Sequence, residues 1–367
     1  MLAAPGLVAS GLARAQPSEA GFLPSPDLSI SPEHPPRFIA GLRPWRRGTF
    51  RLEPGVSGDK LVVHNYGHGG AGITMSWGCA VEVRTYVAAL LEAVKTRKVA
   101  VLGAGVMGLT AATLLRELDV PVTIYAEKFT PHTTSDVAGG QWAPSVVEHA
   151  DEVRFRRILR NAWAMHQNLG AGFGVSARDN YTFRKANELR YAALSGAAEP
   201  QQLSRLPFAN ITHDGWRYPT LLVEPPILLK RLSENLQASG VEMKTMSFKG
   251  AASVQALEEP VLVNCLGLGS RKVWPDEALH GRKGQLALLK AQPHLKYLYS
   301  GIGYLFPRQD HLVVGGSVEY PSTINEDDTP DPVMGMQMIR IVKAVFDGAL
   351  PLPPWLAGAG GGLDPDS

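Results

Sequence analysis

Two glycine-rich loops, each followed by a helix-like segment, are the parts of this sequence best suited to chemistry. The first reads HNYGHGGAGITMSWGCA from His64 to Ala80, and the second reads VAVLGAGVMGLTAATLL from Val99 to Leu115. Free backbone amides at the start of a helix, together with the helix dipole, attract negative charge. The chain therefore holds two candidate anion-binding loops, and their number and order need an explanation.

The second loop carries the pattern of a dinucleotide site. Gly103, Gly105 and Gly108 are spaced as G-x-G-x-x-G between an apolar strand and a helix. The first glycine permits a tight turn, the second lets a pyrophosphate approach the backbone, and the third lets the helix pack on the strand. Glu127 ends the next strand, where a carboxylate can accept from both ribose hydroxyls and would repel a phosphate. The pattern favours FAD or NAD over NADP, and the alternative is a glycine turn with a surface glutamate.

The segment PHTTSDVAGGQWAP, from Pro131 to Pro144, separates a flavin from a nicotinamide. A nicotinamide protein normally continues directly into another helix, whereas this is a long loop of hydroxyls and glycines. Thr133, Thr134 and Ser135 can bond phosphate or ribose, and Ala138 to Trp142 offers backbone at close range to a flat ring. The sequence therefore predicts FAD.

Composition describes a globular chain with room for two domains. Lys and Arg number 36 and Asp and Glu number 34, so the net charge of +2 gives no electrostatic case for nucleic acid or an acidic membrane. Beyond the first residues, no apolar run reaches the length that a bilayer requires. The two cysteines, Cys79 and Cys265, have neither disulfide nor zinc spacing.

The N-terminal head resembles part of a secretory signal. An apolar run from Leu2 to Leu12 precedes Ala13-Arg14-Ala15, a small-x-small cleavage pattern, but the basic front end is missing. We hypothesise that residues 1–15 are the end of a twin-arginine signal whose true first codon lies upstream of Met1. Such a signal would export the folded protein to the periplasm. The alternative is a disordered head on a cytoplasmic protein. Residues 16–36 are Pro/Ser-rich and are expected to be a linker.

Hydrophobic periodicity predicts an α/β fold. Apolar strands of the parallel-sheet kind occur in KVAVLGAG, VPVTIYAEKF and VLVNCLGLGS. Strands separated by turns follow from Gly281 to Tyr320, and residues 351–367 read as a flexible tail. We expect a Rossmann-like nucleotide domain and a second, α+β domain on a mixed or antiparallel sheet. The expected helices are Thr74 to Val94, Met107 to Leu118, Phe155 to Leu169, Ile227 to Ala238 and Met334 to Phe346.

Five motifs together resemble the D-amino acid oxidase family of FAD enzymes, which includes D-aspartate oxidases. They are GAGVMGLTAATLL, IYAEKFTPHTTSDVAGGQW, VNCLG, GLRPWRRGTFRLE and HNYGHGGAGITMSWGCA, and the resemblance extends from Arg37 to Tyr320. In the family the last two motifs end the chain, whereas here they precede the nucleotide pattern. The sequence therefore looks circularly permuted, and the alternative is a shuffled gene assembly.

The resemblance divides the chain into discontinuous domains. It implies an FAD-binding domain from residues 37–150 and 225–270, in which 37–96 is the permuted segment and 98–150 the nucleotide pattern. Residues 151–224 and 271–350 would form the substrate domain. The two loops then have different tasks: the Gly103 loop holds the pyrophosphate, and the Gly67 to Thr74 loop sets a helix start against the flavin pyrimidine, where charge gathers on reduction.

The resemblance also assigns site residues. Arg43 in GLRP matches a carboxylate-binding arginine, Tyr304 in GYLFPR matches a tyrosine that reaches the same carboxylate, and the Gly70 carbonyl matches an acceptor for the substrate amine. Three segments are expected to contact FAD: Gly103, Ala104, Gly105, Val106, Met107 and Gly108; Glu127, Lys128, Thr133, Thr134, Ser135, Gly139, Gly140 and Gln141; and Gly69, Gly70, Gly72, Ile73 and Thr74.

One position departs from the family's animal members, which carry a second tyrosine where this chain has Ser300. Tyr299 is one residue away and would face the other side of a regular strand, unless a bulge at Gly301 or Gly303 turns it. Substrate preference is therefore open.

Other residues that invite a chemical role have a plainer explanation. We expect His64 and His68 to be loop-packing residues and not bases, because hydride transfer from a neutral amine needs none. Trp77 and Trp142 are expected to be core or flavin-wall residues.

The resemblance implies FAD-dependent oxidative deamination of D-amino acids, by hydride transfer to flavin, to 2-oxo acids, ammonia and hydrogen peroxide. The alternatives are an amine or amino acid dehydrogenase with another electron acceptor, and a flavin-binding protein without turnover. The expected partners are the amino acid and dioxygen, with no nucleic acid, no metal and no membrane insertion, and a homodimer is one option.

Overall fold

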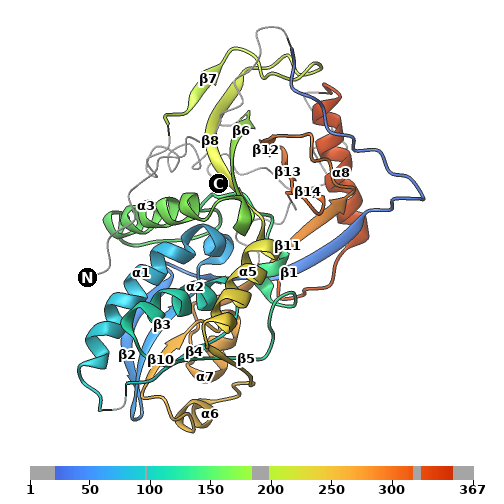
Figure 1. Cartoon of the computed structure of the whole chain (residues 1–367). Helices are drawn as coiled ribbons and strands as arrows, with labels where there is room; N and C mark the ends of the chain where they lie inside the picture. The colour runs from blue at the N-terminus through green and yellow to red at the C-terminus, as the bar shows by residue number, and fades with distance from the viewer. Residues whose placement is uncertain (1–20, 96, 184–197, 317–323, 350–367) are drawn as a thin grey trace.

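A computed structural model describes residues 21–95, 97–183, 198–316 and 324–349 of the chain. These residues form two lobes, each built on one sheet (Figure 1). The predicted signal remnant and the predicted tail lie outside the described residues. The two sheets meet where the candidate site residues lie, so their topology decides the site.

The smaller sheet has six strands in the order β2-β3-β10-β4-β5-β9. All neighbours are parallel except β2 and β3, which form an antiparallel hairpin. Its central strands are fully buried apolar runs, as expected of a parallel sheet covered on both faces. The strands are β2 (Arg51–Ser57), β3 (Lys60–Tyr66), β4 (Val99–Leu102), β5 (Val122–Ala126), β9 (Glu242–Thr245) and β10 (Val261–Asn264).

Helices cover this sheet, and the predicted strand-helix-strand unit β4-α2-β5 is present. Helix α1 packs between α2 and α3, and a Cβ at Gly78 of α1 would overlap the carbonyl of Ile158 in α3. The close crossing of these two helices therefore depends on Gly78. The helices are α1 (Gly72–Leu91), α2 (Val106–Leu115), α3 (Glu152–Leu169), α5 (Pro225–Ala238), and the short α6 (Ala251–Gln255) and α7 (Ser270–Val273).

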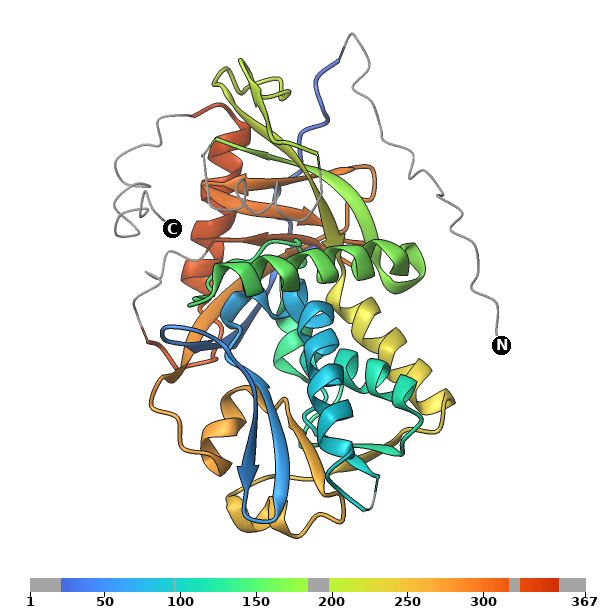
Figure 2. The same ribbon diagram turned by 90° about the vertical axis from the view of Figure 1, so that its left-hand side faces the viewer.

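The larger sheet has eight strands in the order β1-β11-β14-β13-β12-β6-β8-β7. Only β12 and β6 are parallel, so the sheet is mixed, as predicted. Helix α8 (Pro332–Phe346) packs on the face that points away from the smaller sheet (Figure 2). The strands are β1 (Arg37–Arg46), β6 (Val175–Thr182), β7 (Gln201–Leu203), β8 (Gly215–Val223), β11 (Leu279–Leu289), β12 (Tyr297–Gly301), β13 (Gly303–Pro307) and β14 (Leu312–Gly315).

The predicted helices are all present, with boundaries shifted by capping. Helix α3 begins at Glu152 because the Asp151 side chain accepts from the Arg154 amide, and α8 begins at Pro332 because Asp331 caps it in the same way. Helix α2 tightens into a 3₁₀ turn over Arg116–Leu118. The segment YSGIGY forms the ends of two strands joined by a tight turn at Ile302.

Two segments lie elsewhere than the predicted domain boundaries place them. Residues 37–46 belong to the larger sheet as β1, because they pair with β11 along ten residues. Helix α3 packs on α1 of the smaller lobe, although residues 151–224 were expected in the other domain. Apolar surface decides the placement of α3, because its Phe155, Ile158 and Leu159 share a core with α1 and α2.

The segment 16–36 is also more than a linker where it is described. The Leu23 amide donates to the Pro207 carbonyl at 2.8 Å, and Leu28 is buried in the core beneath α8. At the other end of the chain, Phe346 of α8 packs on Phe208 with ring centroids 5.0 Å apart. Both ends of the described chain therefore converge on the loop at residues 206–211.

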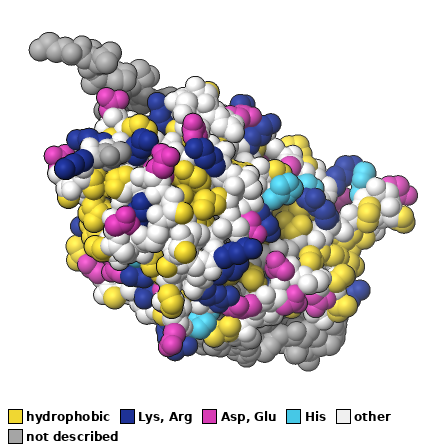
Figure 3. All heavy atoms as spheres, turned by 90° about the horizontal axis from the view of Figure 1, so that it is seen from below, with side chains coloured by type: hydrophobic (Ala, Val, Ile, Leu, Met, Phe, Trp, Pro, Cys, Tyr) yellow, Lys and Arg dark blue, Asp and Glu magenta, His cyan; other side chains and the backbone are white. Residues whose placement is uncertain are grey.

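The surface of the described residues carries charged and apolar side chains beside one another (Figure 3). Among these residues, no helix is both long enough and apolar enough to cross a bilayer. On the face shown in Figure 3, basic and acidic side chains are interspersed. This distribution agrees with the small net charge of the sequence.

The convergence of the chain ends leads to a test of the permuted order. We expect a reordered chain to fold if it starts at Lys98, runs to Ala349, continues through a short Gly/Ser linker into Gly21 and ends at Lys95. Its new ends fall in the exposed turn between α1 and β4, and its new junction spans ends that already share a core. Circular dichroism and the melting temperature measure the result. A chain opened instead inside β4 is the control and should not fold; failure of both would contradict the expectation.

Candidate functional site

The arginine predicted to bind a carboxylate lies flat on the larger sheet. Arg43 of β1 is opposite Arg282 of β11, and its Nη1 donates to the Lys283 carbonyl at 2.8 Å. Its guanidinium rests over Gly284, where an added Cβ would come within 2.5 Å of Arg43 Cζ. Gly284 is inside a regular strand, so the reason for glycine there is space for this side chain.

Tyr304 lies on the same face and approaches Arg43 from the other side. It pairs with Gly315 of β14, and a Cβ at Gly315 would overlap the Tyr304 ring. The ring stacks on Phe306 with centroids 4.6 Å apart. Burial raises the pKa of the Tyr304 hydroxyl, while the nearby Arg43 charge acts in the opposite direction. Gly284 and Gly315 thus form a glycine floor. Arg43 and Tyr304, the two residues predicted to bind the substrate carboxylate, converge on it.

The loop after β5, residues 127–151, covers this floor. A Cβ at Gly139 would be 3.2 Å from the Phe306 ring and 3.6 Å from the Tyr304 ring, and a Cβ at Gly41 would be 3.4 Å from Val137. The 3₁₀ turn Thr134–Val137 therefore packs on β1. The structure brings one predicted cofactor segment against both predicted substrate residues.

The same loop reaches the predicted pyrophosphate cradle. Gly103 has φ of +108°, and a Cβ there would overlap the Cys265 carbonyl. Helix α2 starts at Val106 without a side-chain cap, and the Val106 amide donates to Ser135 Oγ at 3.0 Å. Ser135 already accepts from the Val106 amide, and the uncapped start of α2 leaves its other first-turn amides to an anion, so the donor set fits the diphosphate of a dinucleotide.

The remaining residues of this segment differ in their availability. Glu127 and Lys128 are exposed directly after β5, where a ribose can reach them. Thr134 is exposed, but the Thr133 hydroxyl donates to Asp136 Oδ2 at 2.7 Å, so its proton is already used. Gly140 packs on β8 and the Gln141 side chain donates to the Tyr218 hydroxyl, which gives these two residues structural contacts.

The Gly67 to Thr74 loop is tied to the far end of the same segment. The Gly70 amide donates to the Val146 carbonyl at 3.2 Å. The Thr74 hydroxyl donates to the Ala143 carbonyl at 2.9 Å and accepts from the Ala143 amide at 3.0 Å. Helix α1 has neither a side-chain cap nor an acidic residue in its first turn. The Thr74 side chain therefore fixes the loop against Ala143. The amides of Gly72 and Ile73 lie at the uncapped first turn of α1.

The hairpin register decides the question of the second tyrosine. Ser300 is opposite Tyr304, and Tyr299 is opposite Leu305, so Tyr299 faces the other side. Its ring is fully buried beside Phe346 of α8, at 5.3 Å between centroids. No bulge brings Tyr299 to the site, and Ser300 stands there, accepting from Asn180 at 2.8 Å.

The two histidines of the first loop are buried, as expected. His64 is paired with Asn264 at 3.1 Å, and burial together with the Arg51 charge lowers its pKa to about 4. His68 stacks on Phe50, and burial lowers its pKa to about 3. Both are neutral at ordinary pH. The tryptophans are core residues, since Trp77 and Trp142 are 2% and 3% exposed.

Sequence reasoning missed Arg282. Its guanidinium carbon is 3.4 Å from the centroid of the Trp45 ring, on the same sheet face as Arg43. The sequence signal for Arg282 is the alternation of side chains between the two faces of a strand. Along GRKGQ this alternation puts Arg282 and Gly284 on the same face. Among the described residues, no group of three or more His, Cys, Asp or Glu side chains could hold a metal.

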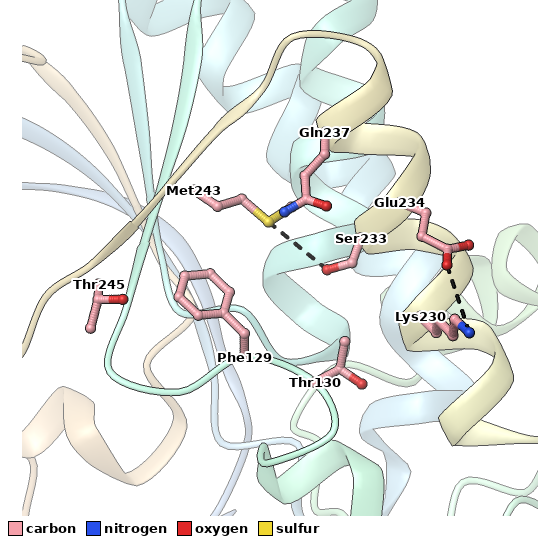
Figure 4. Close-up of a pocket in the computed structure, with 8 residues that line it drawn as sticks. All are labelled: Phe129, Thr130, Lys230, Ser233, Glu234, Gln237, Met243 and Thr245. Atoms are coloured by element: carbon pink, nitrogen blue, oxygen red, sulfur yellow. Dashed lines mark hydrogen bonds and ion pairs between the residues drawn. The ribbon is translucent and has the colours of Figure 1, made fainter.

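A separate hollow of about 420 Å³ lies between α5 and the loop after β5 (Figure 4). Within it Ser233 approaches the Met243 sulfur at 3.9 Å, and Glu234 pairs with Lys230. None of the predicted site residues lines this hollow, so it is distinct from the candidate site. Its lining residues are Phe129, Thr130, Lys230, Ser233, Glu234, Gln237, Met243 and Thr245.

Comparison with known sequences identifies the family of the chain. A family model described as FAD dependent oxidoreductase, DAO, matches residues 98–366. D-amino acid oxidase of Dugesia ryukyuensis is 28% identical over 258 residues, which cover 66% of this chain and 77% of that protein. D-aspartate oxidase of Homo sapiens is 29% identical over 238 residues, which cover 60% of this chain and 69% of that protein.

Solved structures show the same fold. Glycine oxidase from Bacillus cereus matches with a TM-score of 0.52 and 16% identity, covering 69% of this chain and 78% of that chain. An L-amino acid deaminase from Proteus vulgaris, lacking its specific insertion, matches with a TM-score of 0.50 and 15% identity, covering 69% and 75%. The predicted α/β fold with two sheets is confirmed, and the permuted order stays a prediction.

The buried His68 predicts an acid-sensitive loop. Its pKa is about 3 in the folded chain, against 6.5 for an ordinary exposed histidine, so the unfolded chain binds the proton first. The contribution of His68 to stability is therefore complete above pH 6.5 and declines as pH falls towards 3. A His68→Phe variant keeps a ring on Phe50 and cannot protonate.

Urea unfolding of both proteins between pH 7 and pH 4 measures this effect. We expect the free energy of unfolding of the wild type to fall by several kcal/mol relative to the variant over that range. Parallel pH profiles would show that His68 is not buried in its neutral form.

Proposed function

Since the chain belongs to the DAO family of FAD-dependent oxidoreductases, we propose that it is a D-amino acid oxidase. The reaction converts the amino acid, dioxygen and water to a 2-oxo acid, ammonia and hydrogen peroxide. FAD, when bound, supplies the two-electron acceptor for the hydrogen at the substrate α-carbon. The chain's own residues must then bind the carboxylate, orient the α-carbon and exclude water.

The convergence of Arg43 and Tyr304 on the glycine floor carries this proposal. A guanidinium presents a planar fork that grips both oxygens of one carboxylate. Tyr304 adds a hydroxyl donor, and its raised pKa keeps that hydroxyl protonated. Two fixed donors on one carboxylate define the direction of the α-carbon, which is the positioning that the reaction requires.

The substrate amine needs an acceptor but no dedicated base. His64 and His68 are buried and are not placed to take a proton. The Gly70 carbonyl is the proposed acceptor for the amine, and the tie between Gly70 and Val146 fixes the orientation of that loop. The amine is therefore bound as a donor and enters the reaction uncharged.

Three parts of the chain would hold FAD. The start of α2 at Gly103 to Gly108 would bind the pyrophosphate, and Glu127 would accept from the adenosine ribose. The start of α1 at Gly72 would face the flavin pyrimidine, where its free amides stabilise negative charge. Ser135 already bonds the start of α2, which supports placing the loop after β5 against the bound cofactor.

The test is anaerobic addition of D- and L-amino acids to the purified yellow protein. Loss of flavin absorbance with D-isomers alone, reversed by air with stoichiometric peroxide, is the expected result. Bleaching without peroxide on readmission of air would indicate a dehydrogenase, and bleaching by L-isomers would refute the stereochemistry. A protein that binds FAD and never bleaches would contradict turnover of amino acids.

Arg43 offers a direct test of the carboxylate role. We expect Arg43→Ala to lower kcat/KM for D-amino acids by on the order of 100- to 1000-fold, mainly through KM, because two charged hydrogen bonds are lost. Arg43→Lys should recover part of the loss, since a point charge remains. Steady-state peroxide assays at constant FAD saturation measure both. Unchanged KM in Arg43→Ala would remove Arg43 from the site.

Gly284 tests whether the floor positions Arg43. A methyl group at Gly284 would displace the Arg43 guanidinium, so Gly284→Ala should raise KM by about 10-fold and change the melting temperature little. Gly55→Ala on β2 is the matched control, because its Cβ would be 3.6 Å from the His64 ring, an ordinary contact. Equal KM values in the two variants would show that the floor has no such role.

A further inference from the structure

Two arginines face each other across β1 and β11. Arg43 and Arg282 are directly paired in the antiparallel register, so both side chains lie on one sheet face. Like charges in directly opposite positions destabilise a sheet. A pair of this kind at a functional site indicates that anionic ligands compensate the charge.

The two guanidiniums point in opposite directions along the strands. Arg43 turns back over Gly284, and Arg282 turns the other way over Trp45. The Arg43 guanidinium lies at the level of Gly41 and Gly284, and the Arg282 guanidinium lies at the level of Trp45. These levels are four residues apart on the strand, so the two charged groups are separated by about 13 Å along it. They therefore form two anion positions and not one shared position.

Neither arginine has an acidic partner among the described residues. The charges that act on Arg282 are Arg43, Arg47 and Glu148, and Glu148 already accepts from the Gly48 amide at 2.6 Å. Arg282 Nε is shielded from solvent without a hydrogen bond. Neighbouring basic residues are paired differently: Arg46 with Asp276, Arg271 with Glu326 and Lys283 with Asp327. The acidic residues of this region are thus paired with other basic residues, and the charges of Arg43 and Arg282 are available to an anionic ligand.

Trp45 holds Arg282 in position. The ring is 5% exposed, and the guanidinium carbon lies 3.4 Å from its centroid, the geometry of a cation–π contact. Trp45 also approaches Gly69, where a Cβ would be 3.3 Å from the indole. Arg282 is therefore held beside the loop that contains Gly70, the proposed acceptor for the substrate amine.

We propose that Arg282 binds a second carboxylate, so that the preferred substrates are D-amino acids with an acidic side chain, D-aspartate and D-glutamate. This inference rests on the proposed function, in which Arg43 binds the α-carboxylate. A dicarboxylate with two or three carbons between its carboxyl groups spans the two guanidiniums. A neutral side chain leaves Arg282 without an anion.

Binding of non-oxidisable acids to the holoenzyme tests the second site without turnover. Isothermal titration should give a dissociation constant for succinate about 10- to 100-fold lower than for butyrate, a monocarboxylate with the same number of carbons. In Arg282→Met this ratio should fall close to one, while butyrate binding stays unchanged. Lys272→Met removes an exposed positive charge on α7 and is the control, because a long-range charge effect would appear there as well.

Kinetics separate this inference from the proposed function. The ratio of kcat/KM for D-aspartate to that for D-alanine should fall about 10- to 100-fold in Arg282→Met, with D-alanine turnover retained. An unchanged ratio, or an equal loss for both substrates with a lowered melting temperature, would overturn the role of Arg282. Oxidation of no D-amino acid by the wild type would refute the proposed function, whereas the succinate titration would still report on the second site.

Discussion

The loop after β5 is the constraint on which the site depends, because it bonds to both lobes. Ser135 accepts from the start of α2, Gly140 accepts from β8 of the larger sheet, and Ala143 exchanges two hydrogen bonds with the start of α1. These contacts set the distance between the nucleotide cradle and the glycine floor. The loop needs short side chains along this path, and its run of Thr, Ser, Ala and Gly supplies them.

Local patterns predicted most of the fold. The glycine spacing at Gly103 identified the strand-helix-strand unit, and the apolar period predicted the long helices, because both signals lie within a few turns of chain. Helix starts were harder, since caps such as Asp331 lie outside the apolar pattern. The assignment of β1 failed because its partner strand, β11, is far away along the chain.

The site was predictable only where a motif names the residue. Arg43 and Tyr304 were identified from their motifs, and the structure brings them together. Whether Ser300 or Tyr299 faces them depended on strand register, which a shift of one residue reverses. Alternation along GRKGQ puts Arg282 and Gly284 on one face, but only the β1–β11 pairing shows that Arg43 lies on that face too. The hydrogen bond from the Thr133 hydroxyl to Asp136 is likewise visible only in the structure.

The described chain crosses between the two lobes four times. The chain enters the larger sheet at β1, passes to the smaller one at β2, returns at β6, leaves again at α5 and comes back at β11. Neither lobe is a continuous stretch of sequence. A gene fragment that encodes all strands of one sheet therefore also encodes strands of the other sheet, and the two lobes are inherited together.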